Sequence, residues 1–357
     1  TIAELQDKSF KQSILVTNIS AKNSLSILIN EGKLSLHTLP INGAEYNFYL
    51  RKLNKNINKD LDRDNLDYDF DSAYILYEKL IKNVLAEKNL SQELVLYGSD
   101  LLGLPLWALP QNPATSNDYF KNFINANWLV NDHSFAFYFP VTNNFQNDEK
   151  YLNNFVGFGN PSIHPKFKLP NLPSAEEEII LLALYSGETN KNIFTKGNAT
   201  KSNFLKALSE PTKKLAIGTH SLSYDPQNSI FQPILLFAGA DSIITSEDIL
   251  SSQIKSQLVM LTSCNTVDDT SSYDFTLLPR SFLVAGSKAV LFSNWEIESS
   301  SASKISQGIF KNFWINEDIS VQESLRLSVK EALTKSDSLH DLHPKFWAGM
   351  SVAYGNI

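Results

Sequence analysis

The sequence predicts an α/β protein with a mostly parallel sheet that is covered by helices on both faces. Short apolar runs rich in β-branched residues alternate with segments in which apolar residues recur every three or four positions. Two of these runs end on a reactive side chain, one on His220 and one just before Cys264. Functional groups of α/β proteins typically lie outside the carboxyl ends of parallel strands. Hydrophobic residues make up 43% of the chain, which is too many for a disordered protein.

The first part of the chain is expected to form a supporting α/β lobe over residues 1–150. Residues 25–29 and 94–97 are short apolar runs typical of strands, and apolar residues from Ala73 to Val84 follow a helical spacing. Residues 140–153 are rich in Asn, Asp and Gln, and we place the boundary of the lobe there.

Residues 151–357 are expected to form the catalytic lobe. A helix is predicted to begin with a capping box formed by Ser174 and Glu177 and to continue to about Tyr185. Gly286 is the expected stop of a later helix. Further helices are predicted over 200–208, 246–250 and 277–285, and strands over 155–158, 215–219, 256–262 and 288–293.

Composition excludes several classes of function. The net charge of −7 argues against a general nucleic-acid binder, and no apolar run reaches the ~18 residues that a membrane-spanning helix needs. The single cysteine excludes an internal disulfide framework and a cysteine-based zinc site, so we expect a reducing, cytoplasmic location. The first residues are polar and lack an initiator Met, so the chain is expected to be a piece of a longer protein.

Cys264 and His220 are the candidate catalytic pair. Each follows a buried-type strand, so both are expected at the same edge of the sheet, where a thiol and an imidazole can act as nucleophile and base. A free cysteine is also among the most buried residue types. From the spacing alone, the alternative of a core cysteine and a structural histidine therefore stays open.

Five segments, in the same order along the chain, resemble the CHAT domain family, a caspase- and separase-like group of cysteine peptidases in clan CD. One contains the histidine and one the cysteine. The segments are GSDLLGLPLWALP (98–110), LAIGTHS (215–221), LVMLTSCNT (258–266), LPRSFLVAG with SNW (278–286 and 293–295) and HPKFWAG (343–349).

The resemblance implies a caspase-like fold with a pseudo-peptidase-like first lobe, and a catalytic dyad of His220 and Cys264 without a cofactor or metal. It also implies an oxyanion hole formed by the backbone amides of Ser221 and Cys264. Ser221 stands where the family usually has glycine, which puts the geometry of that loop in question. Asn265 also departs from the family pattern, in which an acidic residue is commoner.

The resemblance places the substrate pocket on the segment that follows the next strand, with Trp295, Glu296 and Glu298. Carboxylates there would favour Arg or Lys before the scissile bond, although both glutamates are equally consistent with a solvated surface. Asp225 is a weaker candidate, as are three acids after the cysteine, namely Asp268, Asp269 and Asp274. His343 is interpreted as a packing residue.

The predicted function is regulated, limited proteolysis of a protein substrate by a cysteine endopeptidase, in a bacterial defence or cell-death pathway. The expected partners are the protein substrate and an upstream tetratricopeptide-type or other recognition module, or a regulatory partner; neither a nucleic acid nor a membrane is expected. One alternative is an inactive CHAT pseudo-peptidase that acts as a scaffold or interaction module. Another is a thiol hydrolase or acyltransferase acting on a small molecule.

Overall fold

The computed structural model describes the chain except residues 1, 10–11, 58–66, 99, 142–150, 189–191, 223–229, 231, 263–276, 296, 316–317, 337 and 357. The chain divides into two compact units. The N-terminal unit comprises Thr1–Tyr138, Leu325–Gly349 and Ile357, and the second unit comprises Phe139–Ser324 and Met350–Asn356. The predicted boundary near residue 150 falls in a stretch outside the described residues. The C-terminal segment Leu325–Gly349 belongs to the N-terminal unit, a return of the chain that local sequence patterns do not reveal.

The N-terminal unit contains parallel and antiparallel strands. β1 pairs with β4, and β4 with β5, in parallel, whereas β1 with β2 and β2 with β3 pair antiparallel. In spatial order the strands are β3 (Lys33–Leu39), β2 (Ser24–Asn30), β1 (Ser13–Asn18), β4 (Glu93–Tyr97) and β5 (Ser134–Tyr138). The helices are α1 (Ile2–Lys8), α2 (Gly43–Ile57), α3 (Phe70–Leu80), α4 (Lys82–Leu85), α5 (Tyr119–Asn125), most of α11 (Val321–Thr334), α12 (Leu339–Leu342) and α13 (Pro344–Trp347).

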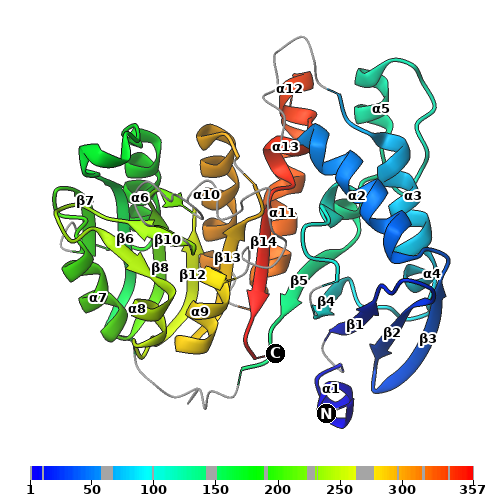
Figure 1. The fold of residues 1–357 in the computed structure, drawn as a ribbon, viewed down its shortest axis with the longest axis horizontal. Helices are drawn as coiled ribbons and strands as arrows, with labels where there is room; N and C mark the ends of the chain where they lie inside the picture. Colours follow the sequence, from blue (N-terminus) through cyan, green and yellow to red (C-terminus); the bar gives the residue numbers. More distant parts are fainter. Residues whose placement is uncertain are drawn as a thin grey trace. The chain divides into compact units, whose positions relative to one another are not determined.

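In the larger sheet of the second unit, the strands pair in parallel except for β13 with β14. In spatial order they are β14 (Met350–Tyr354), β13 (Ser287–Ser293), β12 (Ser256–Leu261), β8 (Thr212–Gly218), β6 (Asn153–Pro161) and β7 (Ile193–Lys196) (Figure 1). The helices are α6 (Pro173–Tyr185), α7 (Lys201–Ser209), α8 (Ser246–Leu250), α9 (Leu277–Ala285) and α10 (Ser299–Ile315).

Helices cover both faces of the larger sheet of the second unit. On β6, Gly157 faces Ile179 of α6, whereas the next residue, Phe158, points to the opposite face and contacts Phe204 of α7. Both faces of the central strands are therefore buried, which explains their continuous apolar runs. The predicted fold class, a mostly parallel α/β sheet between helices, is confirmed.

Three glycines let α6 lie unusually close to the sheet. A Cβ on Gly159 would lie 2.9 Å from the carbonyl oxygen of Ala175, and one on Gly218 would lie 3.0 Å from the Ala175 Cβ. A Cβ on Gly157 would overlap Ile179. The glycines on one face of β6 and β8 thus let α6 pack close to these strands. The start of the helix therefore lies at the carboxyl ends of the strands.

Two local details differ from the sequence prediction. The predicted capping box at Ser174 is wrong, because α6 begins one residue earlier at Pro173, and its N-cap residue, Leu172, makes no side-chain cap. The fixed φ of proline suits the first position of a helix, so Pro173 determines where α6 begins. A small three-stranded sheet in the second unit was also not predicted. It consists of β9 (Ser221–Leu222), β10 (Ile234–Leu236) and β11 (Ile243–Thr245), and these strands are too short to show a periodic pattern.

His343 is a buried packing residue of the N-terminal unit. Its ring lies against Tyr68 and Phe123, with ring centroids 6.0 and 5.5 Å apart. Nδ1 accepts a hydrogen bond from the backbone N–H of Lys345, so Nε2 carries the hydrogen and donates it to the backbone oxygen of Asp67 at 3.3 Å. Burial is the main cause that lowers the pKa of His343 to about 4. The imidazole is therefore neutral in the folded protein at neutral pH.

This buried histidine predicts a loss of stability in acid. The ordinary pKa is 6.5, so between pH 6.5 and about 4 the unfolded chain binds a proton that the folded chain does not. The contribution is complete above pH 6.5 and is lost as the pH falls toward 4, by on the order of 2–3 kcal/mol. We expect His343→Gln to reduce the difference between the free energies of unfolding in urea at pH 7.5 and 4.5 by that amount. A pH difference that is the same in His343→Gln and in the wild type would contradict the assignment.

Candidate active site

The carboxyl ends of three neighbouring parallel strands, β8, β12 and β13, form the candidate active site. Leu261 of β12 pairs with Ile217 of β8, and the next backbone N–H, of Thr262, donates to the Ile217 oxygen at 3.1 Å. Leu261 and Ile217 each lie three residues before the predicted catalytic residues, Cys264 and His220. The two strands thus end side by side and in register.

Several predicted site residues lie outside the described residues. They are the predicted nucleophile Cys264, the pocket candidates Asp225 and Glu296, and the loop acids Asp268, Asp269 and Asp274.

The backbone around His220 is anchored on both sides to β10. The hydroxyl of Thr219 donates a hydrogen bond to the backbone oxygen of Leu236, and the N–H of Leu236 donates to the oxygen of His220 at 2.9 Å. The chain then continues directly into β9, which pairs with β10. His220 is therefore held between two strands although it belongs to neither.

The imidazole of His220 is oriented by a backbone carbonyl. Its Nε2 lies 2.7 Å from the oxygen of Pro170, in the connector that leads to α6. A carbonyl oxygen only accepts hydrogen bonds, so Nε2 carries the hydrogen, and Nδ1 of the neutral ring is left as the acceptor. The carbonyl thus fixes the tautomer of the imidazole, as a carboxylate does for the catalytic histidine of serine peptidases.

Ser221 presents its backbone N–H away from β10. Because Leu236 donates to His220, those two residues form a hydrogen-bonded pair of the antiparallel ladder, and the next pair, Ser221 with Leu235, is non-hydrogen-bonded. The side chain of Ser221 is 4% exposed, and its backbone does not have a positive φ. Serine thus takes the place of the family's usual glycine without left-handed backbone strain.

Trp295 and Glu298 follow β13 at the same edge of the sheet. The Trp295 side chain is buried, and its backbone oxygen accepts a hydrogen bond from the hydroxyl of Ser293. Glu298 is exposed, and its backbone oxygen accepts from Ala302 in α10. Of these two residues, only Glu298 presents its side chain to solvent.

Glu178 is a residue of this region that sequence reasoning missed. It lies on the buried face of α6 and is 4% exposed, near the hydroxyls of Thr262 and Ser306. Burial raises the pKa of Glu178 to about 7, and the two hydroxyls act in the opposite direction. One sequence feature could have identified Glu178 as buried: it lies four residues before Leu182, on the apolar face of a helix. The neighbouring Glu176 and Glu177 concealed that signal, because a run of acids usually indicates a solvated surface.

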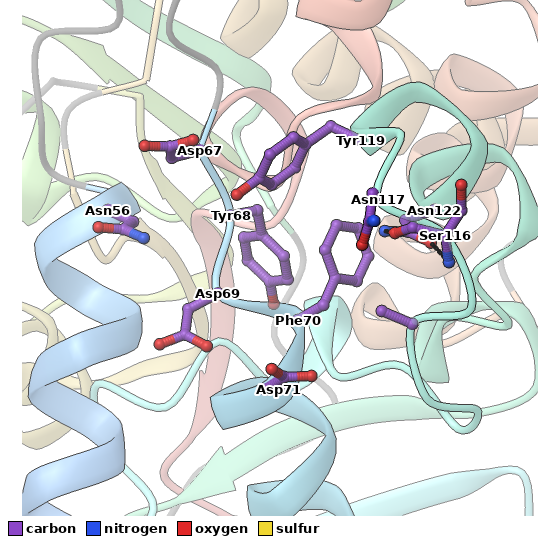
Figure 2. Close-up of a pocket in the computed structure, with 11 residues that line it drawn as sticks. Asn56, Asp67, Tyr68, Asp69, Phe70, Asp71, Ser116, Asn117, Tyr119 and Asn122 are labelled. Carbon is purple, nitrogen blue, oxygen red and sulfur yellow. Dashed lines mark hydrogen bonds between the residues drawn. The ribbon is translucent and has the colours of Figure 1, made fainter.

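A separate cavity of about 350 Å³ lies in the N-terminal unit, where Figure 2 shows three aspartates around tyrosine rings. Asp69 caps α3 and lies 3.4 Å from Lys52. The Tyr119 hydroxyl bonds to Asp67, which together with burial, the larger cause, raises the pKa of Tyr119. Asp67 and Asp69 thus have structural partners. The cavity lies in the N-terminal unit, whereas His220 belongs to the second unit. The cavity is lined by Asn56, Asp67, Tyr68, Asp69, Phe70, Asp71, Ala114, Ser116, Asn117, Tyr119 and Asn122.

The described residues contain no cluster of three or more His, Cys, Asp or Glu side chains that could hold a metal ion. Among the helices whose positions are described, none is long and apolar enough to cross a membrane.

The parallel sheet and the histidine at its edge define the fold class of the clan CD cysteine peptidases. The CHAT domain model matches residues 71–356, so the chain belongs to the CHAT domain family. A comparison with curated proteins finds no match.

Solved structures of the same fold include a chain of the separase–securin complex of Saccharomyces cerevisiae. It is 11% identical with a TM-score of 0.56, and the match covers 99% of this chain but only 30% of that chain. The Arg-specific cysteine proteinase gingipain R (RGPB) is also similar, at 10% identity and a TM-score of 0.47, over 87% of this chain and 74% of that chain. At 11% identity, the likeness to the chain of the separase–securin complex concerns the fold alone.

Proposed function

We propose that the chain is a cysteine endopeptidase in which Cys264 is the nucleophile and His220 the base. The observation that carries the proposal is the fixed imidazole of His220, oriented by the Pro170 oxygen beside the strand that leads to Cys264. Membership of the CHAT domain family adds support. The proposed role is regulated, limited cleavage of a protein substrate.

In the proposed mechanism, Nδ1 of His220 takes the thiol proton of Cys264, and the sulfur bonds to the carbonyl carbon of the peptide. The C–N bond breaks, the imidazolium passes the proton to the departing amine, and a thioester remains. Water then gives a proton to the imidazole and attacks the thioester; the C–S bond breaks and the thiol is restored.

The amides of Ser221 and Cys264 are the proposed oxyanion donors. The direction of the Ser221 N–H, away from β10, supports this assignment. Loss of one such donor typically costs ~10²–10³ in turnover.

The proposed substrate preference is for Lys or Arg before the scissile bond. Glu298 supports it as an exposed carboxylate at the edge that carries His220, and Glu296 and Asp225 are further candidates by their place in the sequence. The buried Trp295 is assigned a packing role beneath the pocket.

A peptide-library cleavage assay, with basic residues included before the cut, tests the proposed function. Because Cys264 is the only cysteine, prior treatment with iodoacetamide blocks one thiol and nothing else of that kind. We expect the untreated protein to cleave and the alkylated protein to be inactive. Cleavage that survives complete alkylation would contradict the proposal, and absence of cleavage with slow labelling would favour an inactive scaffold.

A further inference from the structure

β3 is the outermost strand of the N-terminal unit (Figure 1), and among the described residues the only strand that pairs with it is β2. An edge strand presents unpaired backbone groups, and proteins usually protect such edges with lysine, proline or a bulge. The one lysine of β3, Lys33, is its first residue, and Pro40 lies beyond its last. The register with β2 contains no bulge. The middle of this strand therefore has none of these protections.

The turn between β2 and β3 determines which backbone groups of β3 point outward. Glu31 and Gly32 both have a positive φ, +48° and +74°, as in the two-residue turns that join twisted hairpins. The flanking residues, Asn30 and Lys33, therefore form the closing hydrogen-bonded pair of the hairpin. Every second residue from Lys33 onward bonds to β2, and the residues between them direct their N–H and C=O groups away from it. The outward residues are Leu34, Leu36 and Thr38.

The same three residues are exposed on one face of the sheet. Leu34 is 48% exposed and Leu36 is 71% exposed. Leu25 of β2, which lies opposite Thr38, is 36% exposed and belongs to the same face. The open edge thus combines outward hydrogen-bonding groups with exposed apolar side chains. A strand added there would pair with the first and bury part of the second.

We propose that this edge binds the same edge of a second copy of the chain, antiparallel and around a two-fold axis at Leu36. In this register Leu36 lies opposite Leu36 and Leu34 lies opposite Thr38, so the outward groups of all three residues are paired in both copies. A shift by two residues in either direction leaves one of the three pairs unmade. Lys33 lies opposite Leu39, so no like charges meet.

The match with itself is what favours a second copy over an unrelated extended peptide. Two β3 strands agree in length, in the phase of their outward groups and in their exposed leucines. The association involves the N-terminal unit alone and does not depend on the proposed peptidase activity.

The test is the mass of the full chain in solution, measured by sedimentation equilibrium over a range of concentrations. A contact between two strands is smaller than a standard interface, so we expect the mass to rise from one chain toward two between about 1 and 500 μM. Leu36→Lys and Leu36→Glu each place two like charges opposite one another and remove a leucine. Each should weaken dimerisation by at least about 10-fold. A wild-type chain that stays monomeric over the whole range would overturn the proposal.

An equimolar mixture of Leu36→Lys and Leu36→Glu tests the two-fold axis itself. Because residue 36 lies opposite its own copy, the mixture places opposite charges together and should recover dimers, which also shows that both variants are folded. The matched control is Leu184→Lys on α6, where the leucine is 69% exposed, and it should dimerise as the wild type does. Dimers that persist in Leu36→Lys, a mixture no better than either variant alone, or an equal loss in Leu184→Lys would overturn the proposal.

Discussion

Cys264→Ala is expected to abolish peptide cleavage, with kcat/KM falling by at least ~10⁴-fold. The reason is chemical: no other cysteine exists in the chain, and a methyl group cannot form the thioester. The removal of one sulfur atom leaves the strands β8 and β12 intact, so the free energy of unfolding should change little. The measurement is cleavage of the best library peptide beside a urea unfolding curve.

His220→Ala is expected to cause a loss of similar size, because in the proposed mechanism the two residues act as one unit. The double variant should therefore be no less active than either single variant, whereas independent contributions would multiply. The matched control is His164→Ala, which removes an exposed imidazole from the connector that also contains Pro170. Wild-type cleavage by either dyad variant, or a comparable loss in His164→Ala, would refute the assigned roles.

The sheet of the second unit was predictable because its central strands are buried on both faces and so appear as uninterrupted apolar runs. The strand that contains Leu258 and Val259 and the one that contains Leu215 and Ile217 are examples. Their parallel arrangement follows from the helices between them. The juxtaposition of their carboxyl ends then follows from topology alone.

Other parts of the site were not predictable from side-chain identity. The oxygen that orients His220 belongs to the backbone of Pro170, and every residue has such an oxygen. The closeness of α6 depends on glycines at 157, 159 and 218, whose common role emerges only when β6 and β8 lie side by side. Glu178 is distinguished from its acidic neighbours by its place on the buried face of α6, a helix whose N-cap residue is Leu172 and not the predicted Ser174.

Gly286→Ala is expected to lower the free energy of unfolding by about 3–5 kcal/mol. Gly286 ends α9 with φ = +131°, a conformation that residues with a side chain rarely adopt. A Cβ there would also overlap the carbonyl oxygen of Ile254, and both groups belong to backbone segments held by hydrogen bonds. The next residue, Ser287, begins β13 and pairs with Ser256 of β12, so relief of the overlap must displace the strands that lead to the candidate active site.

The matched control is Gly187→Ala, just after the end of α6. Gly187 also has a positive φ, +65°, but a Cβ there would meet nothing within 4 Å. Its replacement should cost only about 1 kcal/mol, the penalty of the left-handed backbone alone. The free energy of unfolding, measured in urea, should therefore fall further in Gly286→Ala than in Gly187→Ala, and the difference reports the overlap with Ile254. Losses of the same size in the two variants would show that the backbone conformation alone demands glycine at 286. We expect the larger loss in Gly286→Ala because the new Cβ would meet a rigid backbone, which cannot move aside as a flexible side chain can.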